Sequence, residues 1–312
     1  MELEKKISLI IGALAVSLLA SSPFLMGSYA TYMLFLLLIF VGLSSALNYI
    51  AGFVGLHSLG NAVFFGIGAY SFALIARGNV LYAVILASIL CILCSLVFIP
   101  MLGIRGIYFV LSTIFVCEAV RLLVTNLRDL TGGAAGVHVT PPPGYNFSQV
   151  YYFALIVALA AVFVGYVIRN SRAGLYLYAI RENEEAAAAI GVNTVKYKFL
   201  SLALSSIFTG LVGVVYAYYL LYIDPLTSFS VSWSLMPLFT IIIGGEGTVL
   251  GPIFGSITLI FLQEITKPLG EWYLTIFSAM LIIVALFFPE GIIGFITRAF
   301  ARMRKAQKSN RK

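Results

Sequence analysis

Charged side chains are so rare in this sequence that each one inside an apolar stretch is a candidate for chemistry. Glu118 and Arg121 lie three positions apart in such a stretch, a spacing that lets two side chains pair on a helix. If the stretch crosses a membrane, an unpaired charge at its centre costs roughly 2.5–3.5 kcal/mol. The sequence therefore indicates either a structural ion pair or part of a polar pathway, and it leaves both open.

The residue types that bind metals, carry out redox chemistry or hydrolyse nucleotides do not form usable patterns. Cys91 and Cys94 form a C-x-x-C, but Leu, Ile and Val surround them and no histidine or carboxylate lies near. His57 and His138 have no ligand partner at a useful spacing, and the phosphate-binding pattern G-x-x-x-x-G-K-[ST] does not occur in the sequence. We therefore expect no catalytic residue, no metal site and no cofactor in this chain.

Small residues form two further patterns. They recur every four positions in two sets: Ser58, Ala62 and Gly66, and Gly247, Gly251 and Gly255. Small faces let helix backbones approach closely in lipid, so the first interpretation is helix packing. The alternative is that Ser58 and Asn61, with the neighbouring helix breaks, line a translocation pathway, because irregular backbone at membrane depth needs protein or water beside it.

The polar stretch 169–198 differs from the sequence around it. It carries five cations and three carboxylates, Glu182, Glu184 and Glu185. The acidic residues precede four alanines and Gly191, which predicts a short helix over 182–190 that lies outside the membrane and ends at a left-handed glycine. A plain solvated connector is the alternative.

These residues need elements to position them, and the composition decides which elements. Of the 312 residues, 61% are apolar and 10% are charged, with a mean hydropathy of +1.04, which excludes a soluble domain, a disordered chain and a disulfide-rich module. Residues 7–76 contain no charge at all, a run too long for a barrel strand of about ten residues. Helices are required, because they satisfy the backbone in lipid.

The charges, prolines and glycines divide the chain into about ten membrane spans. These are 7–26, 30–50, 56–76, 80–101, 106–125, 149–168, 199–221, 230–245, 249–265 and 271–289. The two small-residue segments fall at matching positions of two five-span halves, which indicates two inverted five-helix repeats. We therefore expect an all-α polytopic membrane protein that forms a single transmembrane domain over residues 1–312.

The positions of the cations predict the orientation. With the N-terminus inside, 15 of the 19 lysines and arginines are cytoplasmic, so both termini are expected in the cytoplasm. The basic tail 298–312 then anchors the chain at anionic lipid and does not bind nucleic acid. The N-terminus is also similar to a secretory signal, but its cleavage would leave nine spans and fit the cations less well, so we expect the first span to be retained.

Several stretches, in order along the chain, resemble one known family. Glu185, Ala186, Ala187 and Gly191 spell E-A-A-x-x-x-G, which is similar to the cytoplasmic coupling loop of permease subunits in ABC importers. The whole stretch AIRENEEAAAAIGVN resembles the branched-chain amino-acid permeases of the LivM type, as do GLHSLGNAVFFGIGAY, EAVRLLVTNLRDLTGG, GGEGTVLGP and FFPEGIIG. The resemblance runs from about residue 30 to residue 298. In the third span, that family usually has Gln and His at the positions of Leu56 and Asn61.

The resemblance implies partners for this chain. They are a second homologous permease subunit in a heterodimer, two cytoplasmic ATP-binding subunits, and an extracytoplasmic binding protein that delivers leucine, isoleucine or valine. The resemblance also implies a multi-pass protein in the cell (inner) membrane of a bacterium or archaeon, in contact with the lipid bilayer. Similar permeases carry urea or other amino acids, so the substrate stays open.

The same resemblance assigns roles to the polar stretch 169–198. The residues of the coupling loop that would act with an ATP-binding subunit are Arg181, Glu182, Glu185, Ala186, Ala187 and Gly191. Ala187 is expected at the docking face, where a larger side chain would block the partner.

Two other classes of function remain to be weighed. A secondary transporter or channel for a small polar solute would need paired carboxylates or ion sites, whereas Glu118, Glu246 and Glu264 are scattered over different spans. A membrane enzyme would need a convergent nucleophile, acid or metal cluster. The sequence therefore favours an ABC permease over both.

The predicted topology can be tested with fused reporters. A reporter that is active only in the cytoplasm should be active after Asn193 or after Lys312, and silent within the outer loop at 133–144, because the cations place these points on opposite sides of the membrane. The measurement is reporter activity in whole cells. An active fusion at Gly136 would overturn the assignment.

Overall fold

The computed structural model of the chain describes residues 16–75, 79–104, 106–142, 144–287 and 291–295. This part of the chain is helical apart from two short strands, β1 (Val137–His138) and β2 (Tyr222–Ile223), which pair antiparallel with Val137 opposite Ile223. The basic tail 298–312 and positions 7–15 of the first expected span lie outside the described residues.

Within the described ranges, six helical segments are long and apolar enough to cross a membrane. They are α2 (Ser28–Val54), α4 (Val80–Val97), α5 (Ile107–Asn126), α7 (Phe147–Asn170), α10 (Thr194–Leu220) and the stretch Pro225–Gly244, which contains α11 (Pro225–Ser228) and α12 (Ser232–Gly244). The expected class, an all-helical polytopic membrane protein, is confirmed at this level.

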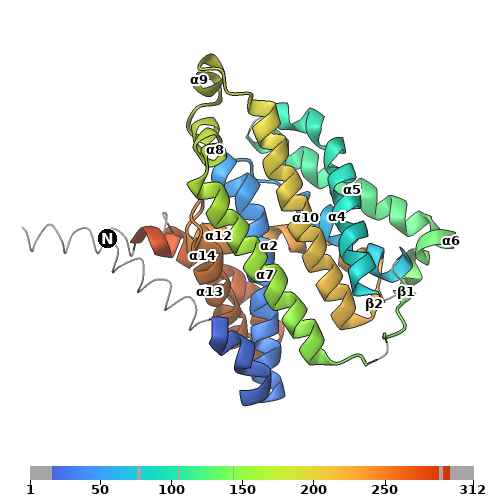
Figure 1. The fold of residues 1–312 in the computed structure, drawn as a ribbon. Coiled ribbons are helices and arrows are strands. Elements are labelled where there is room, and N and C mark those ends of the chain that lie inside the picture. The colour runs from blue at the N-terminus through green and yellow to red at the C-terminus, as the bar shows by residue number, and fades with distance from the viewer. Residues whose placement is uncertain (1–15, 76–78, 105, 143, 288–290, 296–312) are drawn as a thin grey trace, which may run out of the picture.

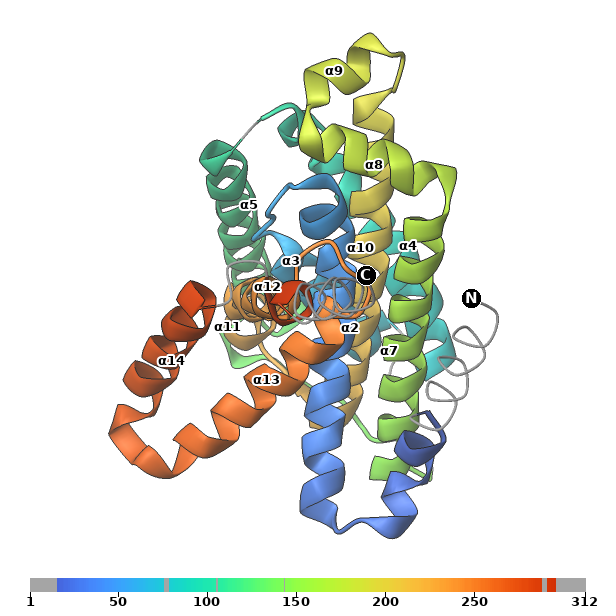
Figure 2. The same ribbon diagram turned by 90° about the vertical axis from the view of Figure 1, so that its left-hand side faces the viewer.

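Shorter elements account for the remaining apolar sequence. They are a helix over Val16–Leu25, α3 (Asn61–Tyr70) with a π-helical continuation (Ser71–Ile75), a 3-10 turn (Ile99–Gly103), α6 (Arg128–Thr131), a second 3-10 turn (Gly133–Ala135), α8 (Arg172–Glu182), α9 (Glu184–Ala189), α13 (Gly251–Thr266), a third 3-10 segment (Lys267–Trp272) and α14 (Tyr273–Phe287). Figure 1 shows that α8 and α9 project beyond the bundle at one end, and Figure 2 shows α13 and α14 spreading away from the central helices at its side.

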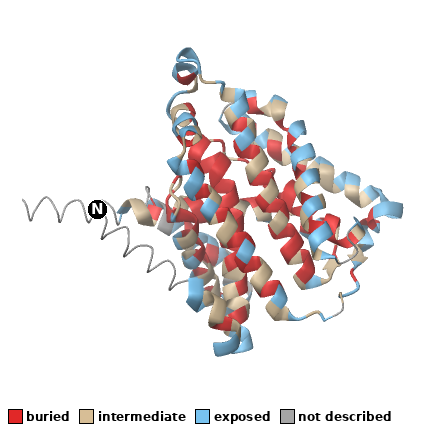
Figure 3. Ribbon diagram, viewed as in Figure 1, coloured by how far each residue is buried: buried red, intermediate tan, exposed pale blue. Residues whose placement is uncertain are grey.

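The core of the bundle is built around α2 and α10. In each of these two helices, 67% of the most apolar window is buried, against 22% in α4 and 17% in α5. α10 packs against α2, α3, α4 and α7, and Figure 3 shows buried residues concentrated along these inner helices. The outer faces of α4 and α5 are therefore left for lipid or a partner.

Small residues allow the closest helix contacts. A Cβ added at Gly68 of α3 would overlap the carbonyl of Gly210 in α10. Gly251 and Gly255 of α13 meet the backbone of Gly245 and Thr240 in the same way. Among the other candidates for helix packing, Ala62 is fully buried and Gly66 lies against the ring of Phe229. Lipid provides no hydrophobic drive for helix association, so these contacts depend on the absence of side chains.

Two helix breaks differ from the sequence expectation. α2 ends at Gly55, which has a φ of +81°, and α3 begins only at Asn61. The expected helix over 56–76 is therefore wrong at its start, and Ser58 lies in the break and not on the helix face of Ala62 and Gly66. Gly247 likewise lies in the turn between α12 and α13 with a φ of +75°, so the expectation that it extends the helix face of Gly251 is also wrong.

The contact between α3 and α10 predicts a measurable stability effect. Gly68→Ala should destabilise the protein by about 1–3 kcal/mol, because the new methyl group meets backbone that cannot rotate away. The control is Gly103→Ala, since a Cβ at Gly103 has nothing within 4 Å. The measurement is thermal unfolding of the detergent-purified protein. Equal midpoints for both variants would contradict the proposed packing.

Candidate functional site

The polar segment 169–198 is built by three successive serine or asparagine caps. Ser171 Oγ accepts a hydrogen bond from the backbone N–H of Gly174 at 3.3 Å and starts α8. Asn183 Oδ1 accepts from Ala186 N–H at 3.0 Å and starts α9. Asn193 then caps α10 in the same manner. Each cap satisfies a backbone donor that a helix end leaves without a partner.

The single helix expected over 182–190 is wrong, because the chain breaks inside it. Asn183 has an extended backbone with φ −158° and ψ 106°, so α8 ends at Glu182 and α9 covers only Glu184–Ala189. Gly191 has a φ of +89°, and this left-handed conformation is the one predicted for it. The segment is a pair of short helices joined at Asn183.

The faces of α9 also differ from expectation. Ala187 is only 2% exposed and packs against the body of this chain, so the expectation that it lies at an open docking face is wrong. Ala186 and Glu185 are exposed instead, and the apolar side chain of Ile190 is 78% exposed. The exposed surface at α9 is therefore formed by Glu185, Ala186, Ala188 and Ala189, with Ile190 directly after the helix.

Lys198 attaches α9 to the membrane helices. Its side chain is 2% exposed, and its ammonium group donates to the carbonyl of Leu102 at 2.9 Å and to Oε1 of Glu184 at 2.5 Å. A buried ammonium group needs such partners, because its desolvation would otherwise be very costly. In the sequence, Lys198 is only one of the five cations of 169–198, because its acceptors come from other elements.

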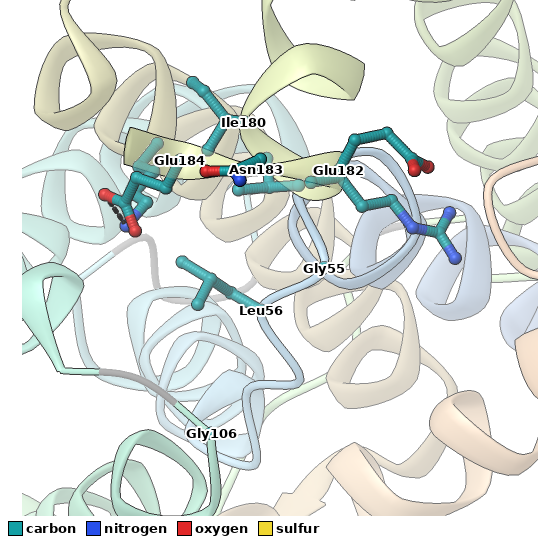
Figure 4. Close-up of a pocket in the computed structure, with 10 residues that line it drawn as sticks. Gly55, Leu56, Gly106, Ile180, Glu182, Asn183 and Glu184 are labelled. Atoms are coloured by element: carbon teal, nitrogen blue, oxygen red, sulfur yellow. Dashed lines mark hydrogen bonds and ion pairs between the residues drawn. The ribbon is translucent and has the colours of Figure 1, made fainter. Parts of the chain in front are cut away.

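A pocket of about 330 Å³ separates α8 and α9 from the end of α2. Figure 4 shows Glu182, Asn183 and Glu184 on one side of it and Gly55, Leu56 and Gly106 on the other. Polar groups of the segment 169–198 and the break after α2 therefore share one open space.

Arg181 and Tyr178 connect α8 to the two helix breaks. Arg181 donates a hydrogen bond to the carbonyl of Gly52 in the last turn of α2. Tyr178 donates to the carbonyl of Gly247 at 2.5 Å. Burial raises the pKa of the Tyr178 phenol above its ordinary value, so the phenol keeps the proton that this bond requires.

Asn48 of α2 holds the turn between α12 and α13 from the other side. Its Oδ1 accepts from Gly247 N–H at 3.0 Å, and its Nδ2 donates to the carbonyl of Thr248 at 2.9 Å. Neither Asn48 nor Tyr178 stood out in the sequence, because an asparagine or tyrosine in an apolar stretch carries no charge pattern. Only the approach of distant segments reveals their role.

The four candidates for a translocation pathway do not form one site. Ser58 and Asn61 are buried, and Asn61 Nδ2 donates to Ser205 Oγ at 3.1 Å. In α5, Arg121 Nε donates to Glu118 Oε2 at 3.0 Å, and a second bond joins the same two groups. In the described part of the chain, no hydrogen bond or ion pair connects the buried pair of residues with the charged pair.

Over the described ranges, no group of three or more His, Cys, Asp or Glu residues could hold a metal ion. Cys91 and Cys117 are buried free thiols, and Cys94 is a partly buried one. The candidate site is therefore a set of hydrogen bonds and ion pairs, and it contains no metal centre among these residues.

Six long apolar helices, two helix breaks closed by neighbouring side chains, and a capped helix pair that projects from one end define a polytopic membrane protein. The arrangement is typical of a membrane subunit that works in a larger assembly.

Comparison with known proteins identifies the family. The family model described as "Branched-chain amino acid transport system / permease component" matches residues 28–286. The chain belongs to this family. It is accordingly a multi-pass membrane permease of an ABC transport system and not an enzyme, and permeases of this kind work with ATP-binding and substrate-binding proteins.

Individual relatives agree with the family. The chain is 25% identical to the high-affinity branched-chain amino acid transport system permease protein LivM of Salmonella typhimurium, over 91% of this chain and 74% of the relative. It is 26% identical to LivM of Escherichia coli, over 87% and 71%. A probable LivM of Methanocaldococcus jannaschii is 24% identical over 70% of each chain. No solved structure is significantly similar to the chain.

The charged pair of α5 can be tested by exchange. Glu118→Gln should destabilise the protein by up to about 3 kcal/mol, because it leaves Arg121 unpaired within the span. The double variant Glu118→Arg with Arg121→Glu should recover most of that loss, since it restores opposite charges at the same spacing. The measurement is thermal unfolding of both variants and of Arg121→Gln. Strictly additive losses would show that the two side chains act independently.

Proposed function

We propose that this chain is one of two homologous permease subunits that translocate leucine, isoleucine or valine across a cell membrane. An extracytoplasmic binding protein delivers the amino acid, and two cytoplasmic subunits hydrolyse ATP. The names of the LivM relatives support the substrate class. The observation that carries the proposal is the family match together with the projecting, capped helix pair α8–α9.

The proposed topology has ten spans in one domain over residues 1–312, in two inverted halves and with both termini cytoplasmic. A helix lies within the described part of each expected span, although that of 56–76 begins only at Asn61. The break before α3 lies between the second and third expected spans, and the turn between α12 and α13 lies between the eighth and ninth. Breaks of this kind support a transporter, in which discontinuous helices meet near the substrate path.

The proposed coupling segment is 169–198, with α9 docking on an ATP-binding subunit. Ile190 is an exposed apolar anchor, and Ala186 beside it leaves room for a partner surface. Glu182, Glu185 and the left-handed Gly191 flank this surface. Lys198 of α10 binds Glu184 of α9 directly. A displacement of α9 is therefore passed to α10 through this contact and not through a flexible loop.

We further propose that α5 faces the second permease subunit and a polar pathway. α5 is among the least buried of the long helices, and the side chains of Arg121 and Glu118 are 24% and 44% exposed. Charges so exposed within a span require water or a partner beside them. Asn61 Oδ1 is buried without a hydrogen-bond partner. It could accept a hydrogen bond from the solute only if α3 and α10 separate. Ser58 and Asn61 therefore act in a later state of the transport cycle.

The docking role of α9 predicts a loss of coupling in a surface variant. Ile190→Asp should reduce the ATP hydrolysis that loaded binding protein stimulates by roughly tenfold, because losing about 1.4 kcal/mol of docking free energy lowers association tenfold. Ile190→Leu is the matched control and should retain stimulation, since it keeps the apolar surface. The measurement is ATP hydrolysis by the reconstituted complex, with and without leucine-loaded binding protein. Unchanged stimulation in Ile190→Asp would mean that 169–198 is a plain connector.

A further inference from the structure

Glu246 brings three separate elements together at the cytoplasmic end of the bundle. Its Oε1 lies 3.1 Å from Nε2 of His57 and 3.6 Å from Nη2 of Arg181, at ion-pair distance but without the geometry of a hydrogen bond. Glu246 belongs to the turn between α12 and α13, His57 to the break between α2 and α3, and Arg181 to α8. We call these three residues the Glu246 cluster. It is a point where the coupling segment touches both breaks at once.

The backbones of Gly52 and Gly247, next to the cluster, are in close contact. A Cβ at Gly52 would lie 2.7 Å from the amide nitrogen of Gly247, and one at Gly247 would lie 2.9 Å from the carbonyl oxygen of Gly52. The same carbonyl accepts the hydrogen bond of Arg181, and Tyr178 binds the carbonyl of Gly247. Close-packed backbone transmits displacement, because neither side can move alone without overlap or a lost bond.

Stability alone does not account for the cluster. The side chains of His57, Arg181 and Glu246 are 39%, 30% and 21% exposed, and partly exposed ion pairs contribute little to folding. The last carbonyls of α2 could also be satisfied by water at the membrane surface. The cluster instead selects which elements are joined, since it places one carboxylate between the guanidinium group of Arg181 and the imidazole ring of His57.

We propose that the Glu246 cluster is a rigid link that carries movement of α8–α9 to both helix breaks, so that ATP hydrolysis opens or closes the path for solute. Arg181 and Glu246 are then positioning residues for transport, and His57 extends the link to α3. The inference rests on the proposed role of 169–198 as the coupling segment. Its consequence is that breaking the link separates ATP hydrolysis from transport without separating the subunits.

The first test neutralises the centre of the cluster. In the complete reconstituted complex, Glu246→Gln should leave co-purification of the ATP-binding subunits and basal ATP hydrolysis within twofold of the unchanged protein. Leucine uptake per ATP hydrolysed should fall at least fivefold. The matched control is Asp129→Asn, which neutralises an exposed carboxylate in α6. Unchanged uptake per ATP in Glu246→Gln, or failure of the complex to assemble, would overturn the proposal.

The second test restores the link covalently in the same sample. A complex with Arg181→Cys and Glu246→Cys should show the low uptake per ATP of Glu246→Gln. A short bis-methanethiosulfonate linker between the two thiols should then raise the ratio at least threefold, and a reducing agent should lower it again. Formation of the linker is measured by mass spectrometry. A fully linked complex with no recovery would show that the cluster is not a rigid link.

The two proposals fail in distinguishable ways. If Ile190→Asp leaves stimulated ATP hydrolysis unchanged, the docking role of α9 is wrong, and with it the basis of the link. If Ile190→Asp abolishes stimulation while Glu246→Gln keeps normal uptake per ATP, docking stands and only the link is wrong.

Discussion

The structure depends on one constraint, which is that lipid offers no partner for a free backbone N–H or C=O group. α3 begins well inside its expected span 56–76, so its first backbone donors must be satisfied by neighbouring helices. Ser234 Oγ accepts from Ala62 N–H at 2.8 Å, and Thr113 Oγ1 accepts from Leu59 N–H at 3.1 Å. Arg181 and Asn48 likewise satisfy backbone groups at the end of α2 and in the turn after α12. The breaks therefore exist because side chains on other helices complete them.

Because of this constraint, the helix packing and the polar hydrogen bonds between helices depend on each other. Small residues bring α3 against α10, and the approach places hydroxyl and amide groups where the helix ends need them. The segment 169–198 is attached by a buried ammonium group at Lys198 and by Arg181. In the proposed coupling, a partner that moves α9 acts on helix ends whose hydrogen bonds come from the same segment.

Sequence patterns predicted the features that depend on neighbouring residues, such as helix positions. They did not predict the features that depend on contacts between residues far apart in the sequence. The long apolar runs located the helices to within a few residues, since length and hydropathy are local properties. The run of glutamates and alanines predicted a helix outside the membrane, but not the extended Asn183 that divides it. Burial of Ala187 and Lys198 was missed because it depends on contacts between separate elements. The contact between His57 and Glu246 was missed for the same reason, since no spacing rule joins residues so far apart in sequence.

The shortness of α9 has a consequence for anyone who wishes to imitate it. Its six residues are far fewer than the roughly 12–15 that an isolated helix needs in order to be stable in water. The helix is therefore stabilised by the Asn183 cap and by the contact between Glu184 and Lys198. A free linear peptide with the sequence of this region would be unstructured in water. It would compete only weakly for the docking site proposed for α9. A useful mimetic would have to be stapled or cyclised, because it must carry within itself the rigidity that the permease supplies from outside.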